Sequence, residues 1–144
     1  MLLDGRLLSC CCTARSYLVR RKPADLLVEQ VTPFQTVLNL ATAKKLGPLD
    51  LILITHGHGD HTGDAVAIGR SSGAQVVAPY EVSVWLGSKG LQNVTGMNPG
   101  GTLRALGLSI TMVPAVHSSS VEEDGKIIYL GVATGYVVKF EDGL

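Results

Sequence analysis

Three of the four histidines in the chain fall within one short segment, residues 55–61, with the sequence THGHGDH. His56, His58 and His61 share this segment with Asp60, so several side chains that can bind a metal ion are close together. Imidazole and carboxylate groups together favour zinc, and iron or manganese also accept them. Histidines also occur in ordinary surface loops, but a cluster this dense directly after an apolar run indicates a metal site.

The spacing of these residues suggests how they share the ion. His56 and His58 are two residues apart, so in an extended segment both rings project to the same side. Asp60 and His61 follow where the chain turns toward a helix, and they can face a second position a few ångströms away. Gly57 and Gly59 have no Cβ, which permits tight backbone curvature around the ions.

The fourth histidine, His117, is the natural partner of this cluster. It follows a second apolar run, residues 108–116, and therefore lies at a strand end, as the first cluster does. A single histidine is more often an ordinary loop or core residue. Together with His56 and His58, however, it completes a three-histidine set, which is the ligand set of a hydrolytic zinc ion.

The predicted chemistry is hydrolysis. An ion with an open coordination position lowers the pKa of bound water to about 7 and polarises a carbonyl or phosphoryl oxygen. Metal-bound hydroxide would then attack the substrate without a side-chain nucleophile. Asp60 is the candidate catalytic residue, as the base that orients the attacking water.

The elements that must position these residues follow an alternating order. Residues 49–55 predict a strand buried on both faces of a largely parallel sheet. The next helix is expected to be capped by Thr62 or Asp60, to face inward with Ala65, Ile68 and Gly69, and to stop at Gly73. A polar loop is predicted for residues 117–126. Other strands are predicted at 16–20, 26–31, 75–78, 94–97, 102–106, 108–114, 127–130 and 132–140, and other helices at 36–46 and 81–89. This order predicts an α/β (α+β) fold with a mixed sheet.

The composition of the chain argues against several classes of function. The chain has 144 residues, 46% of them hydrophobic, which suits one domain or part of a larger one. Its formal net charge is zero, and no basic face is evident, so a nucleic-acid partner is not expected. No run approaches the roughly 20 apolar residues of a membrane span, and we expect no membrane partner and a cytoplasmic location. The contiguous cysteines Cys10, Cys11 and Cys12 read as reduced thiols rather than a redox or metal site.

Three segments also resemble a known family. Residues 55–65, 93–101 and 113–120 look like the UPF0173 metal-dependent hydrolases of the metallo-β-lactamase superfamily, and the resemblance runs from about residue 46 to 144. It implies an αββα sandwich with two metal ions at one sheet edge. Carried over, His56, His58 and His117 would hold the first ion, and Asp60 and His61 part of the second. The resemblance also implies that Ser118, Ser119 and Ser120 line the substrate pocket or support the ligands.

The chain departs from this family at both ends. Members are longer, and they carry a later Asp that bridges the two ions and a late His; here Asp142 precedes the place of the former, and the latter is absent. We therefore expect one partial domain over residues 1–144, the apparently truncated N-terminal half of the sandwich. Its diverged part would be residues 1–45 and its metal-binding part residues 46–144.

Two functions follow from these observations. The first is a zinc hydrolase, with one or two ions, that cleaves an ester, lactone, amide or phosphoester of a small molecule. The alternative is a non-catalytic metal-binding fragment that lacks the complete two-metal centre. In either case a second copy of the chain could cover the exposed sheet as a homo-oligomer.

Overall fold

The computed structural model describes residues 17–19 and 49–140. The strand and helix predicted at residues 26–31 and 36–46, the three cysteines and Asp142 lie outside these described residues.

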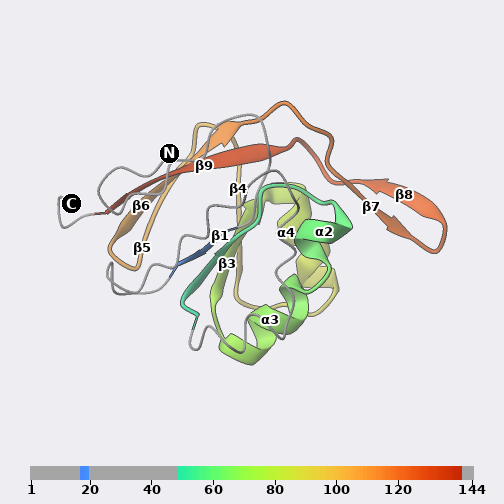
Figure 1. Ribbon diagram of the computed structural model, residues 1–144, viewed down its shortest axis with the longest axis horizontal. Coiled ribbons are helices and arrows are strands. Elements are labelled where there is room, and N and C mark those ends of the chain that lie inside the picture. Colours follow the sequence, from blue (N-terminus) through green and yellow to red (C-terminus); the bar gives the residue numbers. More distant parts are fainter. Residues whose placement is uncertain (1–16, 20–48, 141–144) are drawn as a thin grey trace, which may run out of the picture.

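Three small sheets organise the described chain (Figure 1). The first has the order β1-β2-β3-β4, in which β1 runs antiparallel to β2 and the other neighbours are parallel. The second has the order β5-β6-β9 and is antiparallel, and the third is the hairpin β7-β8. The strands are β1 (Tyr17–Val19), β2 (Leu51–Leu53), β3 (Gln75–Pro79), β4 (Val94–Met97), β5 (Thr102–Ala105), β6 (Leu108–Pro114), β7 (Ser120–Glu123), β8 (Lys126–Tyr129) and β9 (Thr134–Phe140). The predicted mixed sheet is confirmed.

Helices cover one face of the first sheet, and the second sheet covers the other (Figure 1). The helices are α2 (Gly59–Thr62), α3 (Ala65–Ser72) and α4 (Tyr80–Ser88). Alternate residues of the buried strands serve two cores: Ile52 and Val76 pack toward the helices, whereas Leu51 and Val77 pack toward β6 and β9. The described residues thus form layers of helix, sheet and sheet, in which the central strands are buried on both faces.

The helix after the histidine cluster matches its predicted face and its predicted end. Ala65, Ile68 and Gly69 are the buried residues of α3, and Gly73 ends it with a positive φ of 71°. The predicted cap is wrong, because Asp60 and Thr62 lie inside the separate short helix α2. The Thr62 hydroxyl donates instead to the carbonyl oxygens of Gly57 and His58, so it supports the loop that precedes this helix.

The predicted polar loop at residues 117–126 contains a strand that the prediction missed. Residues 120–123 of this loop form β7, which pairs with β8 in a hairpin that projects from the body of the molecule (Figure 1). Glu123 of this hairpin accepts hydrogen bonds from Lys89 Nζ and Trp85 Nε1, each at 2.7 Å. Both bonds lower the pKa of Glu123 below its usual value, and the bond from Lys89 has the larger effect. The hairpin is therefore joined to the region of α4 by a specific polar contact.

None of the helices in the described ranges has both the length and the hydropathy of a membrane-crossing segment.

Candidate metal centre

The histidine cluster lies where β2 leaves the first sheet and enters a buried loop. Residues 54–57 continue from the strand without exposure, and His56 is only 1% exposed. Two groups of β9 hold this segment: the Thr134 N–H donates to the Thr55 carbonyl at 2.9 Å, and Tyr136 Oη donates to the Ile54 carbonyl at 2.8 Å. Burial also raises the pKa of Tyr136, which keeps its hydroxyl a donor. The end of β2 is thus fixed against the second sheet just before His56, the first candidate ligand.

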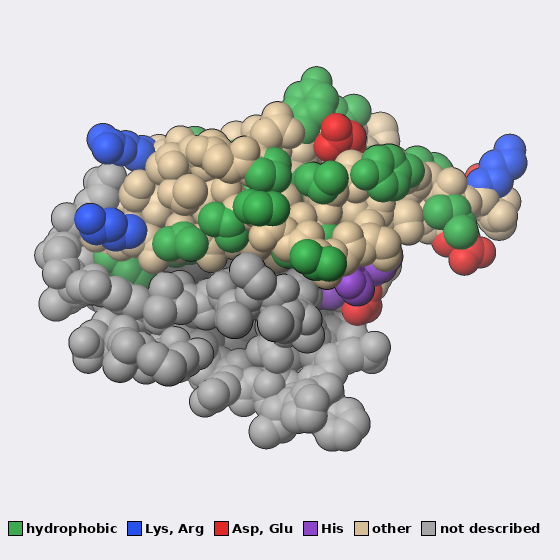
Figure 2. All heavy atoms as spheres, turned by 90° about the horizontal axis from the view of Figure 1, so that it is seen from above, with side chains coloured by type: hydrophobic (Ala, Val, Ile, Leu, Met, Phe, Trp, Pro, Cys, Tyr) green, Lys and Arg blue, Asp and Glu red, His purple; other side chains and the backbone are tan. Residues whose placement is uncertain are grey.

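Histidine side chains reach the surface at one edge of the described body, beside acidic side chains (Figure 2). His58 is half-buried, whereas His117 is exposed on the segment that follows β6. That segment is held by a hydrogen bond from the Ala115 N–H to the Ala133 carbonyl, at 3.1 Å. Residues far apart in sequence therefore meet at one place, where β2 and β6 both end.

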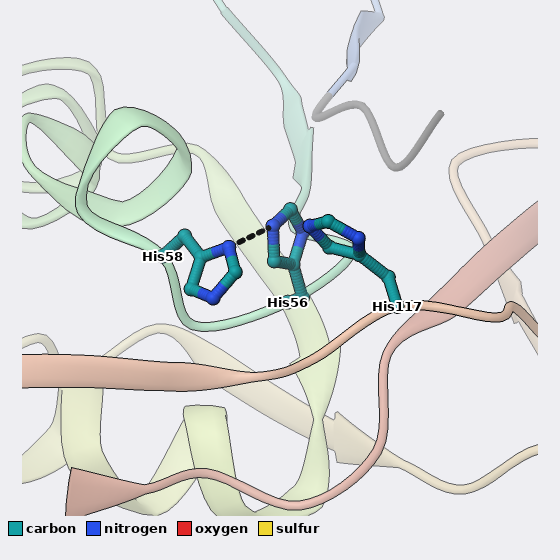
Figure 3. Close-up of side chains that lie close together, drawn as sticks. All are labelled: His56, His58 and His117. Atoms are coloured by element: carbon teal, nitrogen blue, oxygen red, sulfur yellow. Dashed lines mark hydrogen bonds between the residues drawn. The ribbon is translucent and has the colours of Figure 1, made fainter. Parts of the chain in front are cut away.

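The rings of His56, His58 and His117 converge (Figure 3). The ring centroid of His56 is 4.6 Å from that of His58 and 4.8 Å from that of His117. One nitrogen of each ring lies within 4.8 Å of the others. His56 Nε2 lies 3.1 Å from His58 Nδ1. Two nitrogens bound to one tetrahedral zinc are separated by about 3.3 Å, so the donor set fits such an ion.

Asp60 and His61 form a second group, which also includes His56. The ring centroids of His56 and His61 are 4.2 Å apart, and His61 Nε2 lies 3.4 Å from Asp60 Oδ2. The sequence predicted that Asp60 and His61 can face a second position a few ångströms from the first. The two residues form the second candidate group, and His56 belongs to both groups.

Burial sets the charge state of the central histidine. Loss of solvent contact, with further repulsion from His61, His58 and His117, lowers the pKa of His56 to about 3. Burial also lowers the pKa of His61, although the Asp60 carboxylate opposes this shift. Both rings are therefore neutral at pH 7, which is the form that can donate a lone pair to a metal ion.

The three predicted serines have different surroundings. The Ser118 hydroxyl lies 3.2 Å from His58 Nε2, on the side of the ring away from His56. Ser119 is buried; its Oγ accepts from the Gly57 N–H at 3.1 Å and donates to the Leu130 carbonyl at 2.9 Å. Ser120 is the first residue of β7. Ser118 thus contacts a candidate ligand directly, and Ser119 links the histidine loop to the segment after His117.

The two glycines of the motif differ in what they permit. A Cβ built at Gly57 would lie 2.7 Å from Leu130 Cδ1 and 3.1 Å from Leu130 Cβ, so a neighbouring side chain fills the space. A Cβ at Gly59 would meet nothing within 4 Å. Neither glycine has a positive φ. Close packing against Leu130 therefore requires a residue without a Cβ at Gly57, whereas the space at Gly59 does not.

Sequence reasoning overlooked one residue that touches a candidate ligand. Thr55 Oγ1 lies 3.0 Å from His56 Nδ1, and Thr55 is fully buried. The sequence could have indicated this residue, because a threonine stands directly before the first histidine, at the end of a run predicted to be a buried strand.

The chain is similar in sequence to known proteins. A family model described as "Beta-lactamase superfamily domain" matches residues 22–143. The chain is 53% identical over 94 residues to a UPF0173 metal-dependent hydrolase of Methanopyrus kandleri, covering 65% of this chain and 41% of that protein. It is 48% identical over 101 residues to one of Rubrobacter xylanophilus, covering 69% of this chain and 42% of that protein.

A solved structure is similar in fold as well. The metallo hydrolase Igni18 of the archaeon Ignicoccus hospitalis matches with a TM-score of 0.59 and 37% identity, over 74% of this chain and 44% of that one. The chain thus spans about two fifths of the length of the curated relatives that it matches.

Proposed function

The chain belongs to the beta-lactamase superfamily domain family, and from this premise we propose that it serves metal-dependent hydrolysis of a small molecule. The observation that carries the proposal is the convergence of His56, His58 and His117 at the common end of β2 and β6. The similar proteins of Methanopyrus and Rubrobacter are named metal-dependent hydrolases, which supports the same reaction class. We also propose that the protein is located in the cytoplasm.

We assign zinc as the ion because three imidazoles are its common ligand set in hydrolytic sites. Such an ion, with one open position, supplies an acidified water and a polarised substrate oxygen. His56 and His58 would hold it through Nε2 and Nδ1, the nitrogens that face each other at 3.1 Å. His117 supplies the third nitrogen from the other sheet. Manganese or iron instead of zinc is an outcome that metal analysis would identify.

The described residues offer a group of three histidines and a second candidate group that shares His56. Because Thr55 lies against Nδ1 of His56, that ring presents only Nε2 to an ion, although it belongs to both groups. An ion held by the three histidines would therefore leave Asp60 and His61 as the described ligands of a second one. Two protein ligands hold an ion weakly, so we propose a stoichiometry near one for this chain.

Asp60 is proposed as the residue that orients water and takes its proton. It is exposed on α2, so its carboxylate can contact both solvent and a substrate near the histidines. Its carboxylate lies 3.4 Å from His61 Nε2, which supports a role as a proton acceptor beside the histidines. Ser118, which contacts His58, would support a ligand rather than react.

We propose a small-molecule substrate rather than a nucleic acid. On the face drawn in Figure 2, the Lys and Arg side chains lie at the two ends, away from the histidines. Nucleic-acid binding requires basic groups along the path of the phosphates. We propose a carboxylic or phosphoric ester, lactone or amide as the substrate class, because each has an oxygen that an ion can polarise.

Metal titration of the stripped protein tests the proposal. After removal of metal with a chelator, the wild-type chain should take up zinc with a stoichiometry near one, and His58→Ala and His117→Ala should reduce its affinity by similar factors. Unchanged zinc content in the His117 variant would contradict the three-histidine site.

Turnover is measured separately, with the zinc-loaded chain on p-nitrophenyl acetate and bis(p-nitrophenyl) phosphate. Asp60→Asn should lower the rate at least tenfold while zinc stays bound. Tight zinc binding without turnover of either probe would favour the alternative function, a non-catalytic metal-binding protein.

A further inference from the structure

We propose that Thr55 is a positioning residue for His56: its hydroxyl occupies Nδ1 of the ring and so reserves Nε2 for the ion. This inference rests on the proposed function, because it concerns how one ligand of the three-histidine site is presented. It adds a residue that does not touch the ion and that lies on the strand rather than in the loop.

The contact is well fixed. Thr55 is 0% exposed and His56 is 1% exposed, so water does not compete for the 3.0 Å contact between Oγ1 and Nδ1. The backbone of Thr55 is held as well, since its carbonyl accepts hydrogen bonds from both the N–H and the hydroxyl of Thr134. The backbone that carries the hydroxyl is therefore held in place, and the hydroxyl lies close to one ring nitrogen of His56.

The two nitrogens of His56 have opposite environments. Nδ1 faces the Thr55 hydroxyl, whereas Nε2 faces His58 Nδ1 at 3.1 Å, where the ligand atoms converge. A neutral imidazole carries one N–H, and the nitrogen that binds a metal must carry the lone pair. With an ion at Nε2 the proton therefore belongs on Nδ1, and Thr55 Oγ1 accepts it.

A hydroxyl is suited to this position because it serves both states of the ring. Without an ion, Thr55 can donate to Nδ1 while Nε2–H donates to His58 Nδ1, which leaves no buried group unpaired. With an ion, the same hydroxyl turns and accepts from Nδ1–H. A methyl group can do neither, so valine at this position leaves the buried Nδ1 without a partner whenever the ion is bound.

Three variants separate positioning from general stability. Thr55→Val removes the hydroxyl with little change in shape, and Thr55→Ser restores it. Thr134→Val is the matched control, because Thr134 is equally buried and loses the hydroxyl that bonds to the Thr55 carbonyl and to Tyr136, while its N–H still holds the Thr55 carbonyl. Zinc affinity is measured for each by competition with a chromophoric chelator. The ¹⁵N shifts of the His56 ring are measured in the zinc-loaded wild-type protein.

We expect Thr55→Val to weaken zinc binding by about 10- to 100-fold, the usual effect of losing a partner behind a ligand. Thr55→Ser and Thr134→Val should stay within about threefold of wild type. The ¹⁵N shifts should show Nδ1 protonated and Nε2 bound to zinc. Should Thr55→Val fail to fold, these wild-type shifts decide the matter.

Three results would overturn the inference. Equal affinities for Thr55→Val and Thr134→Val would show that the hydroxyl does not act through His56. A wild-type spectrum with Nε2 protonated and Nδ1 on the metal would exclude the proposed orientation. Absence of zinc binding in all the proteins, wild type included, would instead overturn the proposed function and this inference with it.

Discussion

Alanine at Gly57 should lower the free energy of unfolding, whereas alanine at Gly59 should not, although both glycines belong to the same motif. At Gly57 the new methyl group would lie 2.7 Å from Leu130 Cδ1 and 3.1 Å from Leu130 Cβ. The second contact involves the fixed base of the leucine side chain, so a rotamer change alone cannot relieve it. Either the leucine or the loop between His56 and His58 must shift.

The sizes of the two effects follow from this difference. Overpacking in a closed environment costs about 1–3 kcal/mol, so Gly57→Ala should destabilise by roughly 2 kcal/mol. Gly59 is exposed at the start of α2, has no positive φ, and leaves room for a Cβ. Gly59→Ala should therefore be neutral or stabilise by up to about 1 kcal/mol. With an m value of about 2 kcal/mol/M, the two urea midpoints should differ by about 1 M or more.

Urea unfolding of the chelator-treated chain, followed by circular dichroism, measures both variants against wild type. A double variant, Gly57→Ala with Leu130→Ala, provides the internal control, because the smaller side chain removes the Cδ1 contact. The cost of Gly57→Ala should fall in that background. Equal midpoints for the two single variants would refute the packing argument, as would an unchanged cost in the double variant.

Two further predictions concern the same loop. Ser119→Ala leaves the buried Gly57 N–H and the Leu130 carbonyl without their hydroxyl partner and should cost about 2–4 kcal/mol in urea unfolding, whereas Ser118→Ala, at an exposed site, should cost less than about 1 kcal/mol. Similar costs for the two would contradict the link through Ser119. The pKa of His56 is lowered to about 3, so between that pH and about 6.5 the unfolded chain binds more protons than the native one. The metal-free protein should therefore lose up to about 1.4 kcal/mol of stability per unit as the pH falls through this window, and an NMR titration in which the His56 ring protonates above pH 5 would disprove the cause.

The elements that sequence could predict are those whose signal is local. The apolar run before His56 specifies a strand buried on both faces, because each side of it meets a different core. The inward face of α3 repeats at helical spacing, and Gly73 ends the helix in the left-handed conformation that glycine favours. Each of these features leaves a pattern in a short stretch of the sequence, so it could be predicted without knowledge of the fold.

The errors arose where a distant partner decides the conformation. The β7 strand, Ser120–Glu123, is short and polar, and it has no apolar alternation that would predict a strand. It forms because it pairs with β8 and because Glu123 bonds to Trp85 and Lys89. The predicted cap failed for a similar reason, since Thr62 donates to the carbonyls of Gly57 and His58 instead.

In the candidate site, too, some residues could be predicted from the sequence and others could not. Residue type and spacing indicated the ligands, and the structure brings His56, His58 and His117 together, although their metal-binding role stays a prediction. The supporting contacts could not be read from spacing, because Ser119 contacts Gly57 across 62 positions of the chain. Sequence gives the chemistry of a side chain, whereas its partner depends on how the two sheets pack.

The partners in these supporting contacts all come from one part of the chain, and this affects how the site is assembled. The end of β2 is held by Thr134 and Tyr136 of β9, and the loop after it is held by Ser119 and Leu130. Each of these partners comes from the chain after residue 114, which also carries His117. The candidate ligands His56 and His58 are thus fixed by the segment that also carries His117. Formation of the three-histidine set should therefore require β9 to pair with β6 and pack on the first sheet. It follows that zinc binding should appear in refolding experiments together with the packing of the two sheets, and not with formation of the β2–α3 region alone.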